Sequence, residues 1–341
     1  MAAHTPRCLV RGSINIDEFF SLPHIVLPGE TISSTRYAKR AGGKGANQAY
    51  ACAQAGGGVD MDGCIGSDGI WVKDMLQKAG VGVDRVRLIE HEVSQPMSNF
   101  GEKTKDRLRE EPLFNFPQMA KTLSVLLHAG ANANIPSSDT SPDVSSYTHL
   151  LVQNEIPLSS TLTYLSLGLI NIFNPSPMLS PSELRTFPWA SLTWLIVNQG
   201  ELAYLLSALS DQPFAMSDNT SEAVNGQLRT LHCTKGFEKV SVICTLGADG
   251  IAYLLPLEDE GEVRRMSAGR VEGGVKDTTG AGDTFTGYFV AGLMACLELD
   301  EILRNCMTAC AICVERSGAM ESIPTKVEVL ERQASQKTNQ T

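Results

Sequence analysis

Short apolar runs alternate with stretches that favour helix along most of the chain. The clearest run, Val240–Leu246, ends at a glycine, and residues 45–56 are rich in Ala and Gln. The other strand-like runs are 8–16, which ends in a polar turn, and 149–152, 170–173 and 195–197. The other helix-like stretches are 72–79, 284–298 and 300–318. Short strands alternating with helices predict βαβ units, so we expect an α/β fold with a mostly parallel central sheet flanked by helices.

A polar residue or a glycine follows each of these apolar runs. The five residues are Asn15, Glu155, Asn174, Asn198 and Gly247. In open parallel sheets, ligands bind beyond the carboxyl ends of the strands, which meet at one edge. Any one of these residues fits ordinary turn chemistry, but five at one edge favour a binding site.

The charge balance narrows the class of partner. The chain has 341 residues with 28 Lys+Arg and 38 Asp+Glu, which gives a formal net charge of −10. This balance argues against nucleic acid or an anionic membrane as the main partner, although local dipoles can still bind small anions. We find no signal peptide and no apolar stretch long enough to span a membrane. We therefore expect a cytoplasmic protein with reduced thiols, with residence in the nucleus left open.

Three of the nine cysteines have a spacing that also holds iron–sulfur clusters. Cys306, Cys310 and Cys313 are spaced C-x3-C-x2-C, within the helix-like stretch 300–318. On a helix these positions share one face, where buried thiols serve as small core residues. A glycine-rich loop, the usual setting of cluster ligands, is absent here. The pattern therefore favours a stripe of small core residues over a cluster.

Two glycine-rich motifs carry the candidate chemistry. Residues 42–45, Gly-Gly-Lys-Gly, lead into a helix but lack the spacing of a P-loop. In the second motif Gly280-Ala281-Gly282 precedes a helix, whose free N–H groups and dipole suit a transferring phosphoryl group. Asp283 lies in the same turn. It is either a helix-start residue or the carboxylate that takes a proton from an attacking hydroxyl.

These motifs together resemble the ribokinases of the PfkB family of carbohydrate kinases. Three segments carry most of the resemblance: 12–17 (Gly-Ser-Ile-Asn-Ile-Asp), 42–49 (Gly-Gly-Lys-Gly-Ala-Asn-Gln-Ala) and 277–285 (Asp-Thr-Thr-Gly-Ala-Gly-Asp-Thr-Phe). Smaller matches keep the same order at 128–132, 153–155, 174–177, 198–201 and 245–250. The resemblance implies a three-layer α/β/α core plus a small β lid, in one domain over residues 1–341.

The resemblance also implies an activity: transfer of a phosphoryl group from ATP to the 5-hydroxyl of D-ribose, giving D-ribose 5-phosphate and ADP. Asp283 would be the base, and the amides of Gly280, Ala281 and Gly282 would stabilise the developing charge. Ribose would be held by Asn15, Asp17, Gly43, Lys44, Gly45, Asn47, Glu155 and Asp283. ATP would be held by Asn198, Glu201, Thr245, Leu246, Gly247, Ala248, Asp249, Gly250, Gly282 and Met307. Asn198 and Glu201 would order Mg²⁺ through water.

A monovalent cation and a second copy of the chain are further implied partners. Ribokinases bind K⁺ beside the anion hole through one carboxylate and several carbonyls. The matching positions here are Asp277, Thr279, Cys313, Arg316, Gly318 and Ser322. The lid, expected at about 17–41 and 93–127, would pair two subunits into a homodimer.

The sequence departs from the family at residues 93–124. Charged, helix-favouring residues without period-2 alternation stand where ribokinases continue a lid strand. A lineage insertion, a damaged lid and a translated intron all explain this, and the abrupt loss at both ends favours the intron. A missing lid strand would leave an unpaired edge. Met307 stands where the family often has His or Asn near the adenine.

Two other functions stay open from the sequence. The first is a kinase of the same family acting on a nucleoside or another sugar, which the pairing of segments 12–17 and 42–47 disfavours. The second is a non-catalytic homologue that binds sugar or nucleotide. The retained Asp283 speaks against it, whereas the irregular lid segment speaks for it.

Overall fold

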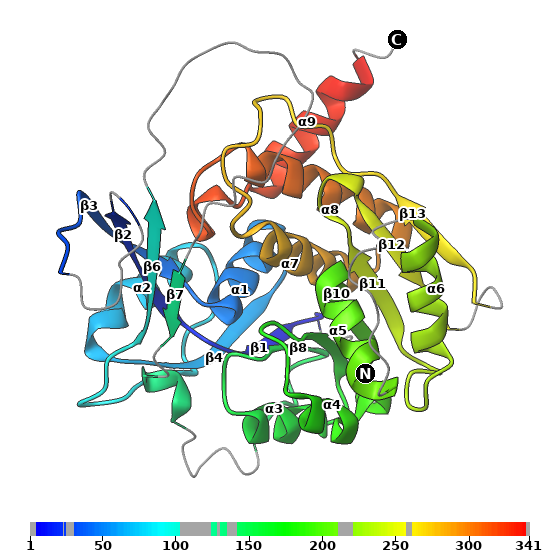
Figure 1. Cartoon of the computed structure of the whole chain (residues 1–341), viewed down its shortest axis with the longest axis horizontal. Helices are drawn as coiled ribbons and strands as arrows, with labels where there is room; N and C mark the ends of the chain where they lie inside the picture. Colours follow the sequence, from blue (N-terminus) through cyan, green and yellow to red (C-terminus); the bar gives the residue numbers. More distant parts are fainter. Residues whose placement is uncertain are drawn as a thin grey trace.

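A nine-stranded sheet forms the centre of the molecule (Figure 1). The computed structural model describes residues 5–22, 24, 31–102, 124–127, 130–134, 142–210, 221–256 and 261–338. The strand order is β13-β12-β11-β10-β9-β8-β1-β4-β5, parallel from β5 to β11 and antiparallel over the last two pairings. The strands are β1 (Cys8–Arg11), β4 (Val59–Ile65), β5 (Val86–Leu88), β8 (His149–Gln153), β9 (Ile170–Asn174), β10 (Trp194–Asn198), β11 (Ser241–Thr245), β12 (Ile251–Leu254) and β13 (Val263–Met266).

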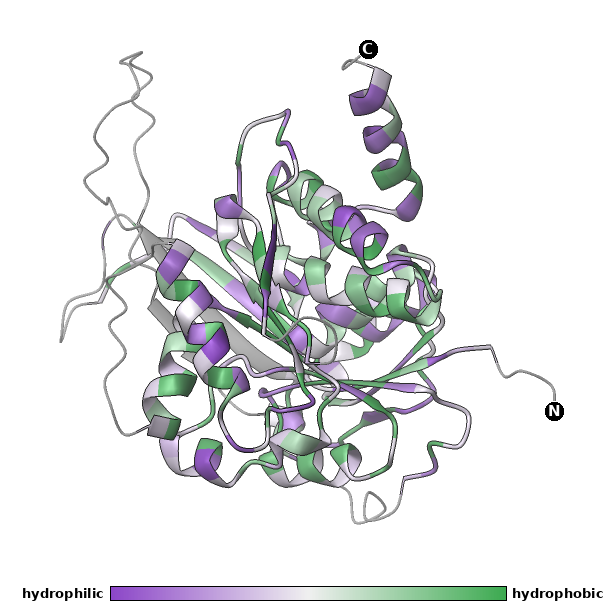
Figure 2. Ribbon diagram, turned by 90° about the vertical axis from the view of Figure 1, so that its right-hand side faces the viewer, coloured by the Kyte–Doolittle hydropathy of each residue, from purple (hydrophilic) through white to green (hydrophobic). Residues whose placement is uncertain are grey.

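Helices cover both faces of this sheet. One layer contains α1 (Lys44–Gln54), α2 (Ile70–Lys78), α7 (Ala281–Met294) and α8 (Leu299–Val314). The other contains α3 (Leu158–Leu165), α4 (Pro181–Thr186), α5 (Gln199–Ser210) and α6 (Ser221–His232). Helix α9 (Lys326–Thr338) follows and projects from the body of the molecule (Figure 2). The three-layer α/β/α core with a mostly parallel sheet confirms the predicted fold class.

The alternation of β1 shows how the sheet divides the apolar core. Cys8 and Val10 pack with α1, α7 and α8, whereas Leu9 packs with α3 to α5. All three are fully buried, because successive side chains of a strand point to opposite faces. Full burial on both faces also explains why the central strands are continuous apolar runs rather than alternating ones.

Three predicted elements have different bounds in the structure. The run 8–16 contains the predicted buried strand and polar turn: β1 ends at Arg11, and after a turn that leaves the central sheet a new strand begins at Asn15. The helix predicted over 300–318 ends at Val314, and Gly318 adopts φ 105°, a value outside the helical region. The helix predicted over 284–298 lies at 281–294, because Cys296 has φ 51°.

A second, four-stranded sheet forms a lid beside the carboxyl edge of the central sheet (Figure 1). Its order is β3-β2-β6-β7. The strands are β2 (Asn15–Leu22), β3 (Arg36–Gly42), β6 (Gln95–Glu102) and β7 (Ser124–Leu127). The small β lid expected from the resemblance is therefore present. Its pairings are mixed, since β2 runs parallel to β6 and antiparallel to β3.

The expected loss of a lid strand after Gln95 is wrong for the described residues. β6 pairs with β2 from Gln95 to Glu102 and with β7 on its other side, so no lid edge is left open there. A ladder on both sides outweighs the weak strand propensity of this segment. Residues 103–123 lie outside the described residues, so the choice between a lineage insertion and a translated intron stays with the sequence.

Candidate active site

Asp283 lies in the first turn of α7, where the anion hole was predicted. Gly280 precedes this helix in the left-handed region (φ 80°), and a Cβ there would lie 2.9 Å from the carbonyl oxygen of Ala319. Only glycine fits both constraints, so the chain can turn sharply into the helix. The first amides of α7 are therefore left without partners inside the helix, as an anion site requires.

Two amides from α1 hold the carboxylate of Asp283. Asn47 Nδ2 and Gln48 Nε2 each donate a hydrogen bond of 2.9 Å, one to each carboxylate oxygen. Asp283 is 8% exposed, so these bonds are shielded from water. Asn47 was a predicted site residue, but Gln48 was not, although it lies inside the segment 42–49. The geometry makes Gln48 an orienting residue for the carboxylate.

A chain of amides fixes the orientation of Gln48 in turn. Its Oε1 accepts a hydrogen bond of 2.6 Å from Gln153 at the end of β8. Its Nε2 also donates to Asn174 Oδ1 at 3.0 Å, and Asn174 Nδ2 donates to the carbonyl of Ile196 at 2.9 Å. Side chains from β8 and β9 therefore fix Gln48, which in turn holds the carboxylate of Asp283. Asn174, predicted as a strand-end residue, acts here through Gln48.

Three buried polar residues that were predicted to bind sugar have unsatisfied atoms. Asn15, Asp17 and Asn47 are 1%, 4% and 5% exposed. Asn15 Nδ2, Asp17 Oδ1 and Asn47 Oδ1 have no hydrogen-bond partner. Buried polar atoms without partners are costly, so their occurrence together indicates that a polar ligand completes them. A polyol, whose hydroxyls both donate and accept, suits this set.

Burial also changes the protonation of Asp17. It raises the pKa of Asp17 from 3.8 to about 7, with further contributions from Glu155, Asp283 and Glu321 and an opposing one from Lys44. The carboxyl lies against Gly42, where any Cβ would clash with it at 2.3 Å. Near neutral pH, Asp17 therefore exists as a mixture of acid and carboxylate.

Glu155 ties the two N-terminal segments together. One of its carboxylate oxygens accepts from Ser13 Oγ at 2.5 Å and from the amide of Lys44 at 2.9 Å. Gly43 has φ 89°, and a Cβ on Gly45 would lie 2.6 Å from the amide of Ser13, so both glycines allow the close approach of the two segments.

Burial acts to lower the pKa of Lys44, but the charges of Asp283, Glu155, Glu201 and Asp17 outweigh it and raise that pKa.

Asn132, from the short helix at Gly130–Ala133, holds the start of the lid strand β2, which carries the predicted sugar-binding residues Asn15 and Asp17. Its side chain accepts from the amide of Ile14 at 3.1 Å and donates to Asn15 Oδ1 at 2.8 Å. These bonds hold one end of the Asn15 amide, while the Nδ2 at its other end is buried without a partner. The sequence segment 128–132 gave the signal for this residue, but its partner could not be read from the sequence.

Asn198 and Glu201 form a reciprocal pair at the start of α5. The amide of Glu201 donates to Asn198 Oδ1, and the amide of Asn198 donates to Glu201 Oε2, both at 2.9 Å. This is the geometry of a capping box, which fixes both side chains at the carboxyl end of β10. Both residues lie at the edge of the sheet predicted for nucleotide and Mg²⁺, and their helix-start role is independent of any ligand.

The stretch Thr245–Gly250 forms a tight turn after β11. The amide of Leu246 donates to the carbonyl of Gly250 at 2.8 Å, and Gly247, Ala248 and Asp249 form one short helical turn. Gly250 has φ 90°, and a Cβ there would lie 2.1 Å from the carbonyl of Met266. Met307 is buried in α8. The predicted ATP residues of this stretch therefore share one loop at the sheet edge.

Asp277 joins the two loops predicted to hold a monovalent cation. Its carboxylate accepts from the amides of Thr279 and Gly318, both at 3.0 Å. Burial acts to raise the pKa of Asp277, but the amides of Gly318 and Thr279 and the charge of Arg40 outweigh it and hold that pKa below its ordinary value. The carboxylate is thus ionised and keeps lone pairs for a cation.

The other predicted cation residues have partners of their own. Cys313 Sγ lies 3.1 Å from Ser322 Oγ and 3.9 Å from the carbonyl of Thr279. Arg316 forms an ion pair with Glu328 of α9 through its side chain, which leaves only its carbonyl for a cation.

The cysteine stripe of α8 packs against α7. Cys306 Sγ donates to the carbonyl of Phe285 at 3.5 Å, and Cys310 Sγ donates to that of Ala281 at 3.3 Å. Burial raises the pKa of both thiols far above the ordinary value, which disfavours the thiolates that a cluster needs. Within the described part of the chain, no group of three or more His, Cys, Asp or Glu could hold a metal ion.

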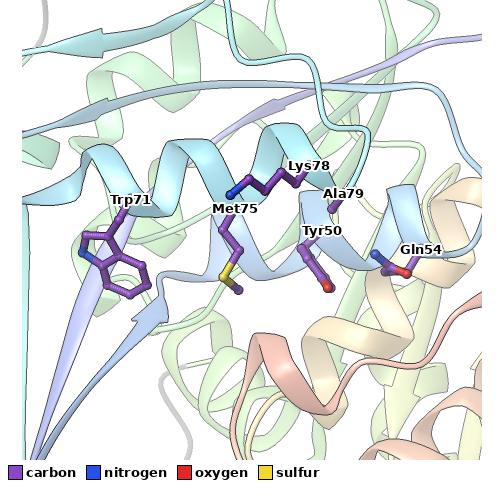
Figure 3. Close-up of a pocket in the computed structure, with 6 residues that line it drawn as sticks. All are labelled: Tyr50, Gln54, Trp71, Met75, Lys78 and Ala79. Atoms are coloured by element: carbon purple, nitrogen blue, oxygen red, sulfur yellow. The ribbon is translucent and has the colours of Figure 1, made fainter.

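A pocket of about 420 Å³ lies between α1 and α2 (Figure 3). It is lined by Tyr50, Gln54, Trp71, Met75, Lys78 and Ala79, none of which was predicted for the site.

In the parts of the chain that the structure describes, no helix is long and apolar enough to cross a membrane.

Known proteins resemble this chain over nearly its whole length. The profile of the pfkB family carbohydrate kinases matches residues 6–109 and 170–326. A ribokinase of Haemophilus influenzae is 32% identical over 331 residues, covering 94% of this chain and 96% of the relative. A ribokinase of Schizosaccharomyces pombe is 30% identical over 336 residues, covering 94% of this chain and 96% of that relative. The chain therefore belongs to the PfkB family of carbohydrate kinases.

Two solved structures are similar in both fold and sequence. A ribokinase of Cryptococcus neoformans var. grubii in complex with ADP has 50% identity and a TM-score of 0.84, covering 96% of this chain and 99% of its own. A ribokinase of Arabidopsis thaliana complexed with ribose and ATP has 25% identity and a TM-score of 0.73, covering 96% and 98%.

Proposed function

We propose that this chain transfers the γ-phosphoryl group of ATP to the 5-hydroxyl of D-ribose. The observation that carries the proposal is the position of Asp283. Its carboxylate is buried, fixed by two amides and placed in the first turn of a helix that begins at an anion hole. The unsatisfied atoms of Asn15, Asp17 and Asn47 support a sugar as the acceptor. The ribokinases to which the chain is similar support ribose as that sugar.

The chain's residues divide the reaction between them. Asn15, Asp17 and Asn47 hold the sugar hydroxyls, with the Gly43–Gly45 backbone and Glu155 shaping the pocket. Asp283 accepts the proton of the 5-hydroxyl while the hydroxyl oxygen attacks the γ-phosphorus. The bond from that phosphorus to the bridging oxygen of ADP then breaks. The amides of Gly280, Ala281 and Gly282 stabilise the charge on the transferring group.

Two cations fit the residues present. Asn198 and Glu201, held by their reciprocal bonds, would order the water around Mg²⁺, whose charge offsets that of the phosphates. The oxygen-only set of Asp277, Thr279, Cys313, Arg316, Gly318 and Ser322 suits a K⁺ ion, since the last five offer carbonyls. A cation there would stiffen the loops on both sides of the anion hole.

Three further expectations belong to the same proposal, on the domain organisation, the oligomeric state and the location in the cell. Residues 1–341 would act as one domain, and the lid would pair two copies of the chain. The outer face of the lid presents Tyr37, which is 51% exposed, to such a partner. Cytoplasmic residence, with the nucleus as the alternative, stays a prediction from the sequence.

The test is ADP release by the purified protein with ATP, Mg²⁺ and K⁺, comparing D-ribose with fructose, adenosine and no sugar. Ribose-dependent turnover is the expected result. Preferred turnover of adenosine or fructose would replace ribose by that substrate, and binding without turnover would indicate the non-catalytic homologue. Asp283→Asn should lower kcat by several orders of magnitude with little change in ATP affinity. A loss below about tenfold would contradict its role as the base.

A further inference from the structure

The lid strands β2 and β3 have two chemically different faces. Residues directly opposite each other in an antiparallel pair share a face, and Asp17 lies opposite Arg40. The outer face carries a separate cluster, in which Glu18 accepts from Tyr37 Oη at 2.7 Å and pairs with Lys39 at 3.1 Å. Arg40 therefore stands on the face of the sugar residues, while its neighbour Lys39 stands on the opposite one.

Arg40 is held in place without using its hydrogen-bond donors. The guanidinium carbon lies 5.3 Å from the ring centroid of Phe19, over the face of the ring. Among the described residues, the guanidinium makes no hydrogen bond and no ion pair. An arginine carries five N–H donors in a fixed fork that suits phosphate. A partly buried arginine with unused donors is thus ready to bind an anion.

The guanidinium points to the rim of the anion hole. A Cβ on Gly318 would lie 3.0 Å from Arg40 Nη1 and 2.8 Å from a carboxylate oxygen of Glu321. The next residue, Ala319, packs its backbone against Gly280, where a Cβ would lie within 2.9 Å. Arg40 is thus separated from the start of α7 by the thickness of one backbone turn. This places a lid cation beside the helix amides that face the phosphoryl group.

We propose that the guanidinium of Arg40 contacts the phosphoryl group while that group passes from ATP to the sugar. The contact persists in the product, where the group is a 5-phosphate. The proposal rests on the proposed function and adds a residue to it. Arg40 forms no covalent bond: the phosphorus gains the sugar oxygen, loses the bridging oxygen of ADP, and the hydroxyl proton goes to Asp283. The ligand class is a phosphate monoester dianion, which a charged fork binds more strongly than the neutral sugar.

The carboxylates around Arg40 define the competing role. Asp277 precedes α7 and Glu321 follows α8, and Arg40 approaches both, so the arginine could instead fasten the lid to these two loops. A fastening role would change the binding of the neutral sugar and of the phosphorylated product alike. A phosphate contact changes the product and the transition state but leaves the neutral sugar unaffected. The two roles therefore separate in a comparison of ribose with ribose 5-phosphate.

The experiment compares Arg40→Ala, Arg40→Lys and Lys39→Ala with the wild type. Calorimetry gives the Kd of ribose and of ribose 5-phosphate, and steady-state kinetics gives kcat and KM. In Arg40→Ala, we expect the Kd of ribose 5-phosphate to rise and kcat to fall, each about 10- to 100-fold, with the Kd of ribose unchanged. Arg40→Lys should recover part of both losses, because it keeps the charge but not the fork. Lys39→Ala removes the same charge from the outer face and should change neither.

Each other outcome has a definite meaning. Equal values for Arg40→Ala and Lys39→Ala would overturn the phosphate contact. Parallel weakening of ribose and ribose 5-phosphate would assign Arg40 to fastening the lid and would also overturn it. A folded wild type that neither binds nor phosphorylates ribose would refute the proposed function itself, which is a result distinct from both.

Discussion

Asp17 tests the electrostatics of the predicted sugar site, because its carboxyl is buried near other carboxylates. It is 4% exposed and has one oxygen without a partner. Burial is the main cause that raises its pKa from 3.8 to about 7, followed by the charges of Glu155, Asp283 and Glu321. The perturbation is Asp17→Asn, which keeps the shape of the side chain and removes the titration.

The sign and size follow from the two pKa values. Below about pH 4 the carboxyl is protonated in both the folded and the unfolded chain, so it has no effect on stability. Between about pH 4 and 7 the unfolded chain loses its proton while the folded chain keeps it, so the wild type loses stability as the pH rises. Above about pH 7 the cost is constant. A difference of 7 − 3.8 = 3.2 units corresponds to about 4 kcal/mol.

Urea unfolding of the ligand-free proteins at several pH values between about 4 and 8 measures this cost. We expect Asp17→Asn to be more stable than the wild type by up to about 4 kcal/mol at pH 8, with the difference vanishing near pH 4. Asp74→Asn, an exposed acid on α2, controls for the exchange of an acid for an amide. Equal stability of Asp17→Asn and the wild type at pH 8, or a difference that does not vary with pH, would refute the reasoning.

Other perturbations probe the groups around Asp283. Gln48→Ala should lower kcat about 10- to 100-fold, since it removes a hydrogen bond to a charged group. The control Gln54→Ala, on the same helix but lining the pocket of Figure 3, should leave kcat unchanged. Equal rates for the two variants would contradict the orienting role of Gln48. Gly280→Ala should lower the unfolding free energy by at least about 1–2 kcal/mol and reduce kcat, because Gly280 has φ 80° and the backbone of Ala319 occupies the place of a Cβ. Unchanged urea unfolding would count against the required left-handed turn. K⁺ should stimulate turnover more than Na⁺, and equal rates in K⁺ and in cation-depleted buffer would remove the cation site at Asp277.

The sequence predicted the central sheet well because burial on both faces leaves an unmistakable pattern. Continuous apolar runs marked β8 to β11, and the residues that follow them lie at one edge, as expected. The polar turn predicted at the end of the run 8–16 is present, but the pattern did not show that Gly12 and Ser13 carry the chain from the central sheet into the lid strand β2. A change of sheet leaves no mark on periodicity.

The lid strand β6 was missed for a different reason. Its sequence, Gln95–Glu102, contains Pro96 and Gly101 and shows no alternation, so local propensity argues against a strand. Pairing with β2 and β7 creates it, and those partners are distant in the sequence. A strand defined mainly by its neighbours is invisible to any local reading. One argument for a non-catalytic homologue, the interrupted lid, loses its basis in this part of the chain.

Residues that act on other side chains were the hardest to find in the site. Gln48, Gln153 and Asn132 all lie inside segments that the sequence singled out, yet no ligand chemistry pointed to them individually. Each bonds to a side chain that comes from another part of the chain. Such roles require the three-dimensional arrangement, whereas a carboxylate beside a helix start already suggests its chemistry in the sequence.

In the proposed mechanism Asn47 would connect recognition of the sugar to the proton transfer. Its Nδ2 is bonded to Asp283 at 2.9 Å, while its Oδ1 is buried and without a partner. Both atoms belong to one amide, so a hydroxyl that donates to Oδ1 must lie within a few ångströms of the base. An acceptor molecule that lacks this hydroxyl leaves a buried oxygen unpaired, which costs about 1–3 kcal/mol. In the proposed mechanism the same amide would favour a polyol and bring it to the base, so selectivity for the sugar and the geometry of the reaction would depend on one side chain.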